Sequence, residues 1–329
     1  MAWTIAAFAA AGWAFAFDSG KWLSERGDDS DAVRLREVYD RRVPEITQPA
    51  ENVVFPIETN PDGTIKSRLR AGKAYVFLDA GFVWGADVVV EQYEAGGKTA
   101  TGTLTADNCI VDRKTKTGWV PGNAKIVWGE TSVAGRGVHF DLGREYVKIF
   151  ANTRIESDAL GGKGVKDALG GVAPREAGKK NPKPAAAGGK KKAEIVAERT
   201  DYDHKEGVVL FDRNVHLDDA EYQMATDRLF VFLEGTNSLR RLVALGNVAI
   251  TNGTKRARCA KAAYVRKTGK IDLYGDERAK ARLEDVGGKK AAVEGDRVTF
   301  WADSEQVEVE DAAVFVPAFG KSGKKGLGL

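Results

Sequence analysis

The stretch CAKAAYVRKTGKIDLYGD, from Cys259 to Asp276, decides the fold class. It begins with the period-two alternation of a β-strand, turns at Lys267-Thr268-Gly269-Lys270, and continues as a second alternating strand. A hairpin of this kind exposes an apolar face that it cannot cover alone. The stretch therefore predicts an antiparallel sheet that is assembled from successive hairpins.

Related hairpins recur along the chain at a spacing of about 25 residues. In the second half they occupy residues 224–251, 259–285 and 294–316, and residues 133–156 of the first half fit the same template. Each combines a small residue, an alternating strand, a polar turn and a second strand. Stacking of such units predicts an all-β protein with two facing sheets.

Composition favours a folded protein, with 43% apolar and 29% charged residues in 329. The net charge of +3 comes from one stretch, because Lys163 to Lys192 holds nine Lys and Arg against two Asp and Glu. A nucleic-acid surface needs its cations clustered on a folded element. The charge distribution therefore gives little support to nucleic-acid binding.

No catalytic or metal constellation is apparent. Cys109 and Cys259 are two isolated cysteines, which fits structural thiols or one disulfide between the halves. Gly97-Lys98-Thr99 resembles the end of a phosphate-binding loop, but Gln92 stands where its first glycine is needed. We therefore expect a non-enzymatic protein without catalytic residues, metal or cofactor.

The amino terminus carries an uncharged segment from Ala2 to Phe17. As a helix it would span about 24 Å, against a hydrocarbon core of roughly 30 Å. It fits a secretory signal with Ala14-Phe15-Ala16 as cleavage site, or a membrane anchor that extends to Leu23. Residues 1–23 are therefore predicted to be a signal peptide or an anchor, which places the remainder outside the cytoplasm.

The remaining chain divides by composition. Residues 24–52 form a charged stalk with a helical spacing at Val33, Leu35 and Val38. The predicted β-modules are 53–157 and 194–317. Gly, Ala, Pro and Lys dominate residues 158–193, which predicts a disordered linker, and residues 318–329 form a flexible tail. Whether the linker lets the two modules stack in one molecule is open.

Five short phrases carry a resemblance to a known family. They are Arg213-Asn214-Val215, Ala225 to Leu229, Ala244 to Val248, Ala260 to Tyr264, and Leu273 to Gly275. Their order and spacing resemble the OstA-like, or LptA, family of periplasmic lipopolysaccharide-transport proteins. The first phrase departs from the family pattern at Arg213, where glycine is usual. The first half, from about Val53 to Ile155, resembles the related LptC component more faintly.

The resemblance implies a β-jellyroll, or β-taco, of stacked antiparallel strands in each of two OstA-like modules. It also implies that acyl chains of lipopolysaccharide lie between the sheets and that modules join edge to edge into a bridge. The predicted partners are thus lipopolysaccharide or a related glycolipid, other Lpt components by edge-strand addition, and the inner membrane through residues 2–23. Nucleic acid is not an expected partner.

Strand alternation assigns side chains to faces independently of the family. Leu229, Val231 and Leu233 point one way, whereas Phe230 and Phe232 point the other. A packed core and an open lipid groove both remain compatible with this pattern. The lipid-groove candidates are Leu229, Val231, Leu233, Val243, Leu245, Val248, Ile250, Ile271, Leu273, Val298, Phe300, Val307 and Val309.

The sequence thus predicts a periplasmic carrier that is tethered to the inner membrane, or secreted after signal cleavage. It would pass lipopolysaccharide from the inner to the outer membrane. The alternative is a structural envelope protein with a packed core and no lipid site. Edge strands for partner binding are predicted near Ala74 to Leu78, Val208 to Phe211, and Val307 to Val316.

Overall fold

The structure is a computed structural model of the 329-residue chain. It describes residues 19–26, 28–94, 96, 98–129, 131–157, 193–219, 222–234, 238–253, 255–286, 291–301 and 307–315. Residues 1–18 of the predicted signal or anchor at 1–23 and the tail at 318–329 lie outside these ranges, whereas residues 19–23 are helical. The predicted linker at 158–193 also lies outside them, except for Ala193, which begins a strand and so was wrongly assigned to the linker. No helix in the described ranges is both long enough and apolar enough to cross a membrane.

The described residues from Ser19 to Ile46 belong to a separate unit, which is mainly helical. It comprises α1 (Ser19–Arg26), α2 (Ser30–Arg42) and a short 3-10 turn, η2 (Val43–Glu45). α2 confirms the helical spacing within the predicted stalk at 24–52, but the last residues of that stretch, Ala50 to Asn52, belong to a strand. The buried face of α2 contains Ala32, Leu35 and Val38, whereas Val33 is exposed, so the predicted apolar face was wrong by one position.

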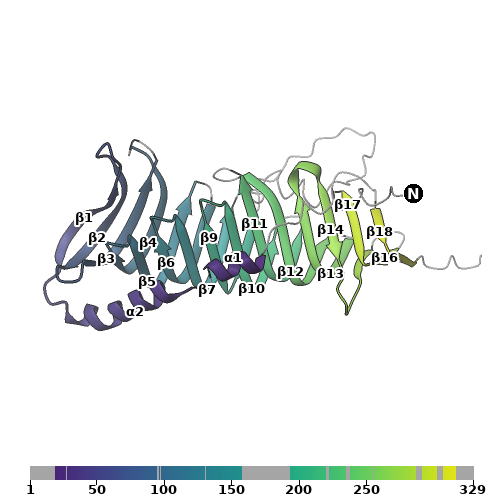
Figure 1. Cartoon of the computed structure of the whole chain (residues 1–329), viewed down its shortest axis with the longest axis horizontal. Helices are drawn as coiled ribbons and strands as arrows, with labels where there is room; N and C mark the ends of the chain where they lie inside the picture. The colour runs from purple at the N-terminus through teal and green to yellow at the C-terminus, as the bar shows by residue number, and fades with distance from the viewer. Residues whose placement is uncertain are drawn as a thin grey trace, which may run out of the picture. The chain divides into compact units, whose positions relative to one another are not determined.

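The second unit, from Thr47 onward, is built from antiparallel strands (Figure 1). This confirms the predicted all-β class. The strands are β1 (Ala50–Thr59), β2 (Ile65–Phe77), β3 (Phe82–Tyr93), β4 (Ala100–Asp112), β5 (Thr117–Trp128), β6 (Thr131–Asp141), β7 (Tyr146–Ser157), β8 (Ala193–Ala197), β9 (Arg199–Asp203), β10 (Val208–Asp218), β11 (Gln223–Glu234), β12 (Ser238–Asn252), β13 (Lys255–Val265), β14 (Lys270–Tyr274), β15 (Ala281–Asp285), β16 (Ala292–Gly295), β17 (Arg297–Trp301), β18 (Val307–Glu310) and β19 (Ala313–Phe315); a 3-10 turn, η3 (Arg266–Thr268), joins β13 to β14.

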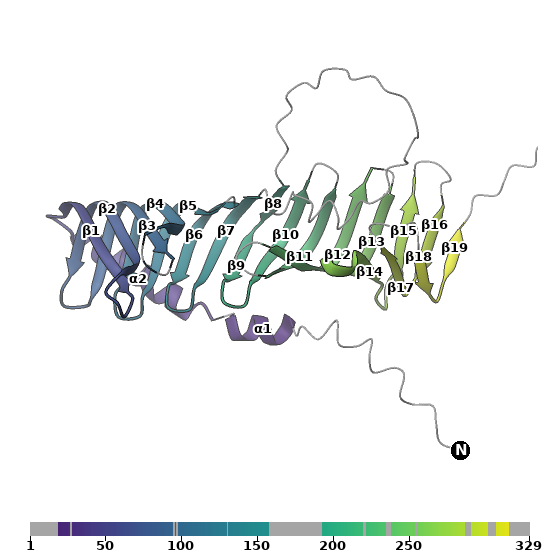
Figure 2. The ribbon, with the colours of Figure 1, turned by 90° about the horizontal axis from the view of Figure 1, so that it is seen from above.

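Strand pairing runs without interruption from the first half into the second (Figure 2). β7 pairs with β8 over Thr153 to Ser157 and with β9 over Tyr146 to Ile149. β10 then pairs with both β8 and β9 on their other side. The two halves are therefore stacked in one molecule, and β8 with β9 acts as one strand that is broken in the middle.

Most long strands contain a kink near their centre, where the pairing register is interrupted. Left-handed φ angles mark it in β3 at Asp87, in β7 at Asn152, in β10 at Arg213 and Asn214, and in β12 at Gly246 and Asn247. Glycine and asparagine tolerate these angles better than other residues do. The Arg213-Asn214-Val215 and Gly246-Asn247-Val248 phrases are thus bends within strands.

Two of the family phrases hold each other at this kink. The Thr226 hydroxyl donates to the carbonyl oxygens of Leu245 and Gly246, at 3.0 Å each. Asn247 Nδ2 donates to Asp227 Oδ2 at 2.9 Å. A Cβ at Gly246 would lie 2.3 Å from the same Asp227 oxygen, so glycine is required there for space as well as for its φ of +79°. Sequence phrases about 20 residues apart therefore form one structural unit.

The kinks divide the ladder into two half-sheets, and one apolar core lies between them. β12 shows the pattern, because Leu242 and Ala244 before the kink and Val248 and Ile250 after it all belong to this core. Cys109 and Cys259 are both free thiols. The core extends from Leu69 in β2 to Val298 in β17, so it joins both halves of the chain.

The open edges of the ladder differ from the prediction. β2, which contains Ala74 to Phe77, is covered by β1, and β10 is paired on both sides, so neither is an edge strand. β1 is an edge strand, because its described pairing is with β2 alone. The other end is formed by β18 and β19, which include part of the predicted Val307 to Val316 segment.

Candidate functional site

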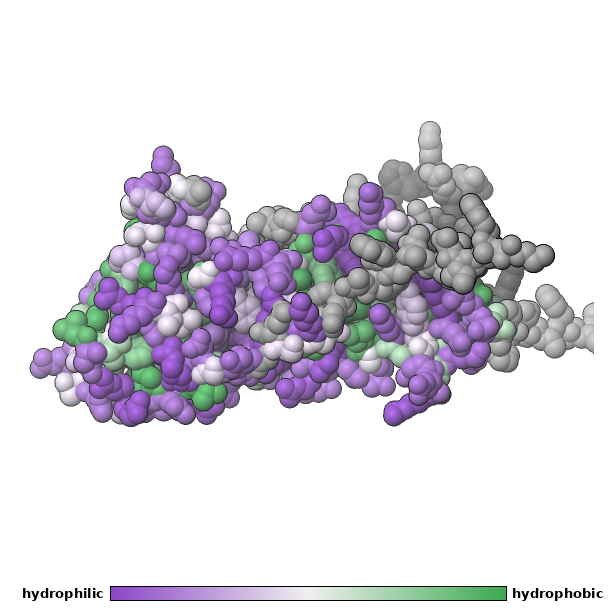
Figure 3. Space-filling view, viewed as in Figure 1, coloured by the Kyte–Doolittle hydropathy of each residue, from purple (hydrophilic) through white to green (hydrophobic). Residues whose placement is uncertain are grey.

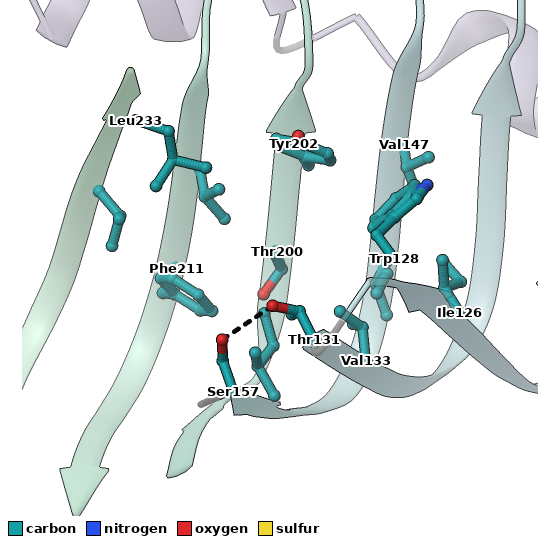
Figure 4. A pocket seen from close by; sticks show the side chains of 14 residues that line it. Ile126, Trp128, Thr131, Val133, Val147, Ser157, Thr200, Tyr202, Phe211 and Leu233 are labelled. Carbon is teal, nitrogen blue, oxygen red and sulfur yellow. Dashed lines mark hydrogen bonds between the residues drawn. The ribbon is translucent and has the colours of Figure 1, made fainter. Parts of the chain in front are cut away.

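The interior contains a cavity of about 80 Å³ where the two halves of the chain meet. Figure 4 shows the side chains that surround it. Eleven of its fourteen lining residues are aliphatic or aromatic. The lining consists of Ile126, Trp128, Thr131, Val133, Val147, Ile149, Ile155, Ser157, Thr200, Tyr202, Val209, Phe211, Val231 and Leu233.

Alternation and the kink together place these side chains. β7 contributes Val147 and Ile149 from before its kink, and Ile155 and Ser157 from after it. Side chains two residues apart on a strand share a face. Since both pairs line the same cavity, the two half-sheets face each other across it. β9, β10 and β11 each add two residues at the same spacing.

A second, larger hollow of about 330 Å³ adjoins the cavity. Trp128, Val147 and Tyr202 line both spaces. The rings of Trp128 and Tyr202 meet edge to face, with centroids 5.1 Å apart. These two rings stand between the inner cavity and the outer hollow, and we call them the aromatic gate.

Tyr202 is held in its neutral form at the gate. Burial raises the pKa of Tyr202 to about 12, and the nearby charges of Asp203 and Glu145 act in the same direction. A neutral ring can lie against apolar matter without the cost of desolvating a charge. The gate therefore presents an uncharged surface to whatever occupies the cavity.

Lys66 and Glu145 line the outer hollow, Glu58 pairs with Lys66, and Lys116 pairs with Glu58; we call these four residues the charged rim. His204 also lines the hollow. Lys116 Nζ lies 2.8 Å and Lys66 Nζ 3.4 Å from the Glu58 carboxylate. His204 Nδ1 lies 3.6 Å from Glu145. Burial alone would raise the pKa of Glu58, but its bonds with Lys116 and Lys66 lower it. An apolar interior thus opens next to a network of fixed charges.

Eleven of the thirteen predicted groove residues fall into three groups. Val231 and Leu233 line the cavity. Leu229, Val248, Ile250, Ile271, Leu273 and Val298 are buried in the core along the rest of the interior, and Phe300 and Val309 are half-buried against it. Val307 is exposed. Their role as a lipid groove stays a prediction.

The pairing register between β11 and β12 places two of the predicted groove residues, Val243 and Leu245, on the face opposite the core. Val243 pairs with Phe230 and Leu245 with Arg228, whereas the core residues Leu229 and Val231 pair with Ala244 and Leu242. All four residues from Leu242 to Leu245 are apolar, so period-two alternation alone could not show which two of them face the core. Cross-strand pairing makes that choice.

The sequence prediction missed most of the cavity, because every predicted groove residue lies at or beyond Leu229. Twelve of the lining residues lie outside the predicted set, among them Trp128, Thr131 and Tyr202. The sequences on either side of residues 158–192 do show the period-two alternation of strands with one apolar face. The missing information was that Ser157 and Ala193 are paired neighbours.

No group of His, Cys, Asp or Glu in the described part of the chain is arranged to hold a metal ion.

Comparisons with known proteins find a family that part of the second half resembles. Residues 194–306 match the family described as LptA/(LptD N-terminal domain) LPS transport protein. Among solved structures, LptH from Pseudomonas aeruginosa, described as the LptA homologous periplasmic component of the conserved lipopolysaccharide transport device, is similar at 10% identity. That match has a TM-score of 0.33 and covers 38% of this chain and 94% of LptH. No curated protein sequence matches this chain.

Proposed function

Because residues 194–306 match the LptA/(LptD N-terminal domain) family, we propose that this chain is an OstA-like Lpt protein and a non-enzymatic carrier of lipopolysaccharide in the periplasm. Its acyl chains would lie between the two half-sheets, and the protein would pass them from the inner to the outer membrane. The single observation that carries this proposal is the apolar cavity next to an open hollow with a charged rim.

The chemistry of the site fits an acylated, charged lipid. Each methylene that moves from water into such an interior contributes about 0.8 kcal/mol. The charged rim lies beside the outer hollow, where the head of a lipid would remain while its chain passed the aromatic gate. Lys66, which lines the hollow, supplies a cation for phosphate or carboxylate groups on that head.

The ends of the ladder fit a bridge between modules. β1 presents one unpaired edge within the described part of the chain, and Val54 on it is 60% exposed. Figure 3 shows hydrophobic residues at the β1 end of an otherwise mostly hydrophilic face. We propose that other Lpt components add strands at β1 and at β18 or β19. The first half would serve as an LptC-like module, tethered to the inner membrane through residues 2–23.

The decisive experiment is photo-crosslinking of the purified full chain to lipopolysaccharide. A photoreactive amino acid at Val231 or Leu233 should crosslink, because both line the cavity. The matched controls are Phe230 and Val243, which are paired neighbours on the opposite face. Crosslinks at the first pair alone support the carrier. Folded protein without crosslinks at either pair would support the structural envelope protein instead.

A further inference from the structure

Three hydroxyl groups interrupt the apolar lining of the cavity. Thr131 Oγ1 and Ser157 Oγ are hydrogen-bonded to each other at 2.8 Å. The third, on Thr200, points toward them in Figure 4. Thr200 is 3% exposed, and its Oγ1 has no hydrogen-bond partner in the part of the chain that the structure describes.

An unpartnered buried hydroxyl is unfavourable unless something else completes its hydrogen bonds. Valine has nearly the same shape as threonine and would fill this position without that cost. A ligand oxygen inside the cavity would supply the missing partner. A buried water would do the same, since three hydroxyls surround a space large enough to hold it.

The position of Thr200 fixes where such an oxygen would lie on a bound chain. Thr200 and Tyr202 share a face of β9, two residues apart, and Tyr202 belongs to the aromatic gate. At about 3.4 Å per residue, Thr200 lies about 7 Å further along the strand. A chain that enters past the gate therefore meets Thr200 with its first few carbons and not with its far end.

From this geometry we infer that the cavity selects an acyl chain with a hydroxyl group close to its head, and that Thr200 is the specificity-determining residue. The inference rests on the proposed function, because it takes the cavity as the acyl-chain site. A site built to hydrogen-bond a hydroxyl discriminates against an analogue that lacks it, since its own polar group then stays unpaired.

The test measures binding of three fatty acids to the full chain by competition with a bound fluorescent fatty acid. The probes are β-hydroxylaurate, ω-hydroxylaurate and laurate. We expect β-hydroxylaurate to bind about tenfold more tightly than laurate, which corresponds to about 1.4 kcal/mol. The ω-hydroxyl should bring no such gain, because it lies at the wrong end of the chain.

Variants of Thr200 show whether the preference depends on its hydroxyl group or on the shape of its side chain. The Thr200→Val variant should bind β-hydroxylaurate and laurate about equally, whereas Thr200→Ser should keep the preference for β-hydroxylaurate. Thr153→Val is the matched control, because Thr153 is also a buried threonine with an unpartnered hydroxyl among the described residues but does not line the cavity. It should leave the preference at about tenfold.

The outcomes are distinguishable. Equal binding of β-hydroxylaurate and laurate to the unaltered chain would overturn the inference and leave the carrier intact, as expected if water completes the hydrogen bonds of Thr200. A preference that survives Thr200→Val would overturn the assignment of Thr200. Folded protein that binds none of the three fatty acids would overturn the proposed acyl-chain site itself.

Discussion

Two regions of the apolar interior differ in how completely side chains fill them. Between β13 and β17, Ile271, Leu273 and Val298 are no more than 1% exposed and pack within the core. Where β5 to β7 meet β9 to β11, the same inward alternation leaves a cavity. The second region contains Thr131, Ser157 and Thr200, whose short side chains fill less space. Alternation and cross-strand register thus determine which side chains face inward, and the size of those side chains determines whether they fill the space between the half-sheets.

The sharpest way to test this comparison is to shorten one leucine in each region. Leu273→Ala removes a fully buried side chain and should lower the free energy of unfolding by about 2–5 kcal/mol. Leu233→Ala should cost about half as much or less, because Leu233 is only partly buried and already borders empty space. Urea unfolding of both variants measures the difference. Equal losses would contradict the distinction between a filled and an unfilled region.

Enlarging one valine in each region should give the opposite pattern. Val298→Phe overpacks a site with 0% exposure and should destabilise the protein by about 1–3 kcal/mol. Val231→Phe can extend into the cavity, so it should change stability by less than about 1 kcal/mol. It should also weaken binding of fluorescent fatty acid at least tenfold, while Val298→Phe should not. Retained binding in Val231→Phe would place the lipid elsewhere.

A smaller effect comes from the unpartnered hydroxyls. In ligand-free protein, Thr200→Val and Thr153→Val should each stabilise the fold by about 1 kcal/mol, because each removes a buried group without a hydrogen-bond partner in the described chain. Thermal unfolding measures both. A loss of stability in Thr200→Val alone would indicate that its hydroxyl is already satisfied, by water, in the ligand-free cavity.

The smallest effect concerns the charged rim of the cavity region. The pKa of Glu58 is lowered below its usual 4.5, so its ion pairs stabilise the fold above that pH and are lost as the pH falls through the folded-state pKa. The difference in unfolding free energy between the unaltered chain and Glu58→Gln should therefore be largest at neutral pH and vanish in strong acid. Glu277→Gln, at an exposed turn, controls for removal of one negative charge.

Much of the fold followed from local pattern. Period-two alternation predicted the strands, and the spacing of Leu35 and Val38 predicted α2. The role of the Gly246-Asn247 phrase did not follow, because a left-handed φ ends a strand in one context and bends it in another. Here the hydrogen bonds from Thr226 and Asn247 to residues on the neighbouring strand hold the bend, and those are non-local contacts.

By itself, the sequence determined the all-β class, the shared face of Leu229, Val231 and Leu233, and the match of residues 194–306 to the LptA/(LptD N-terminal domain) family. These depend on local alternation and on the order of short phrases. The tertiary structure alone decided that Ser157 pairs with Ala193, and thereby that the cavity forms at the join. A cavity is the space that several strands fail to fill, so its position depends on cross-strand register and on side-chain volumes that no single segment encodes.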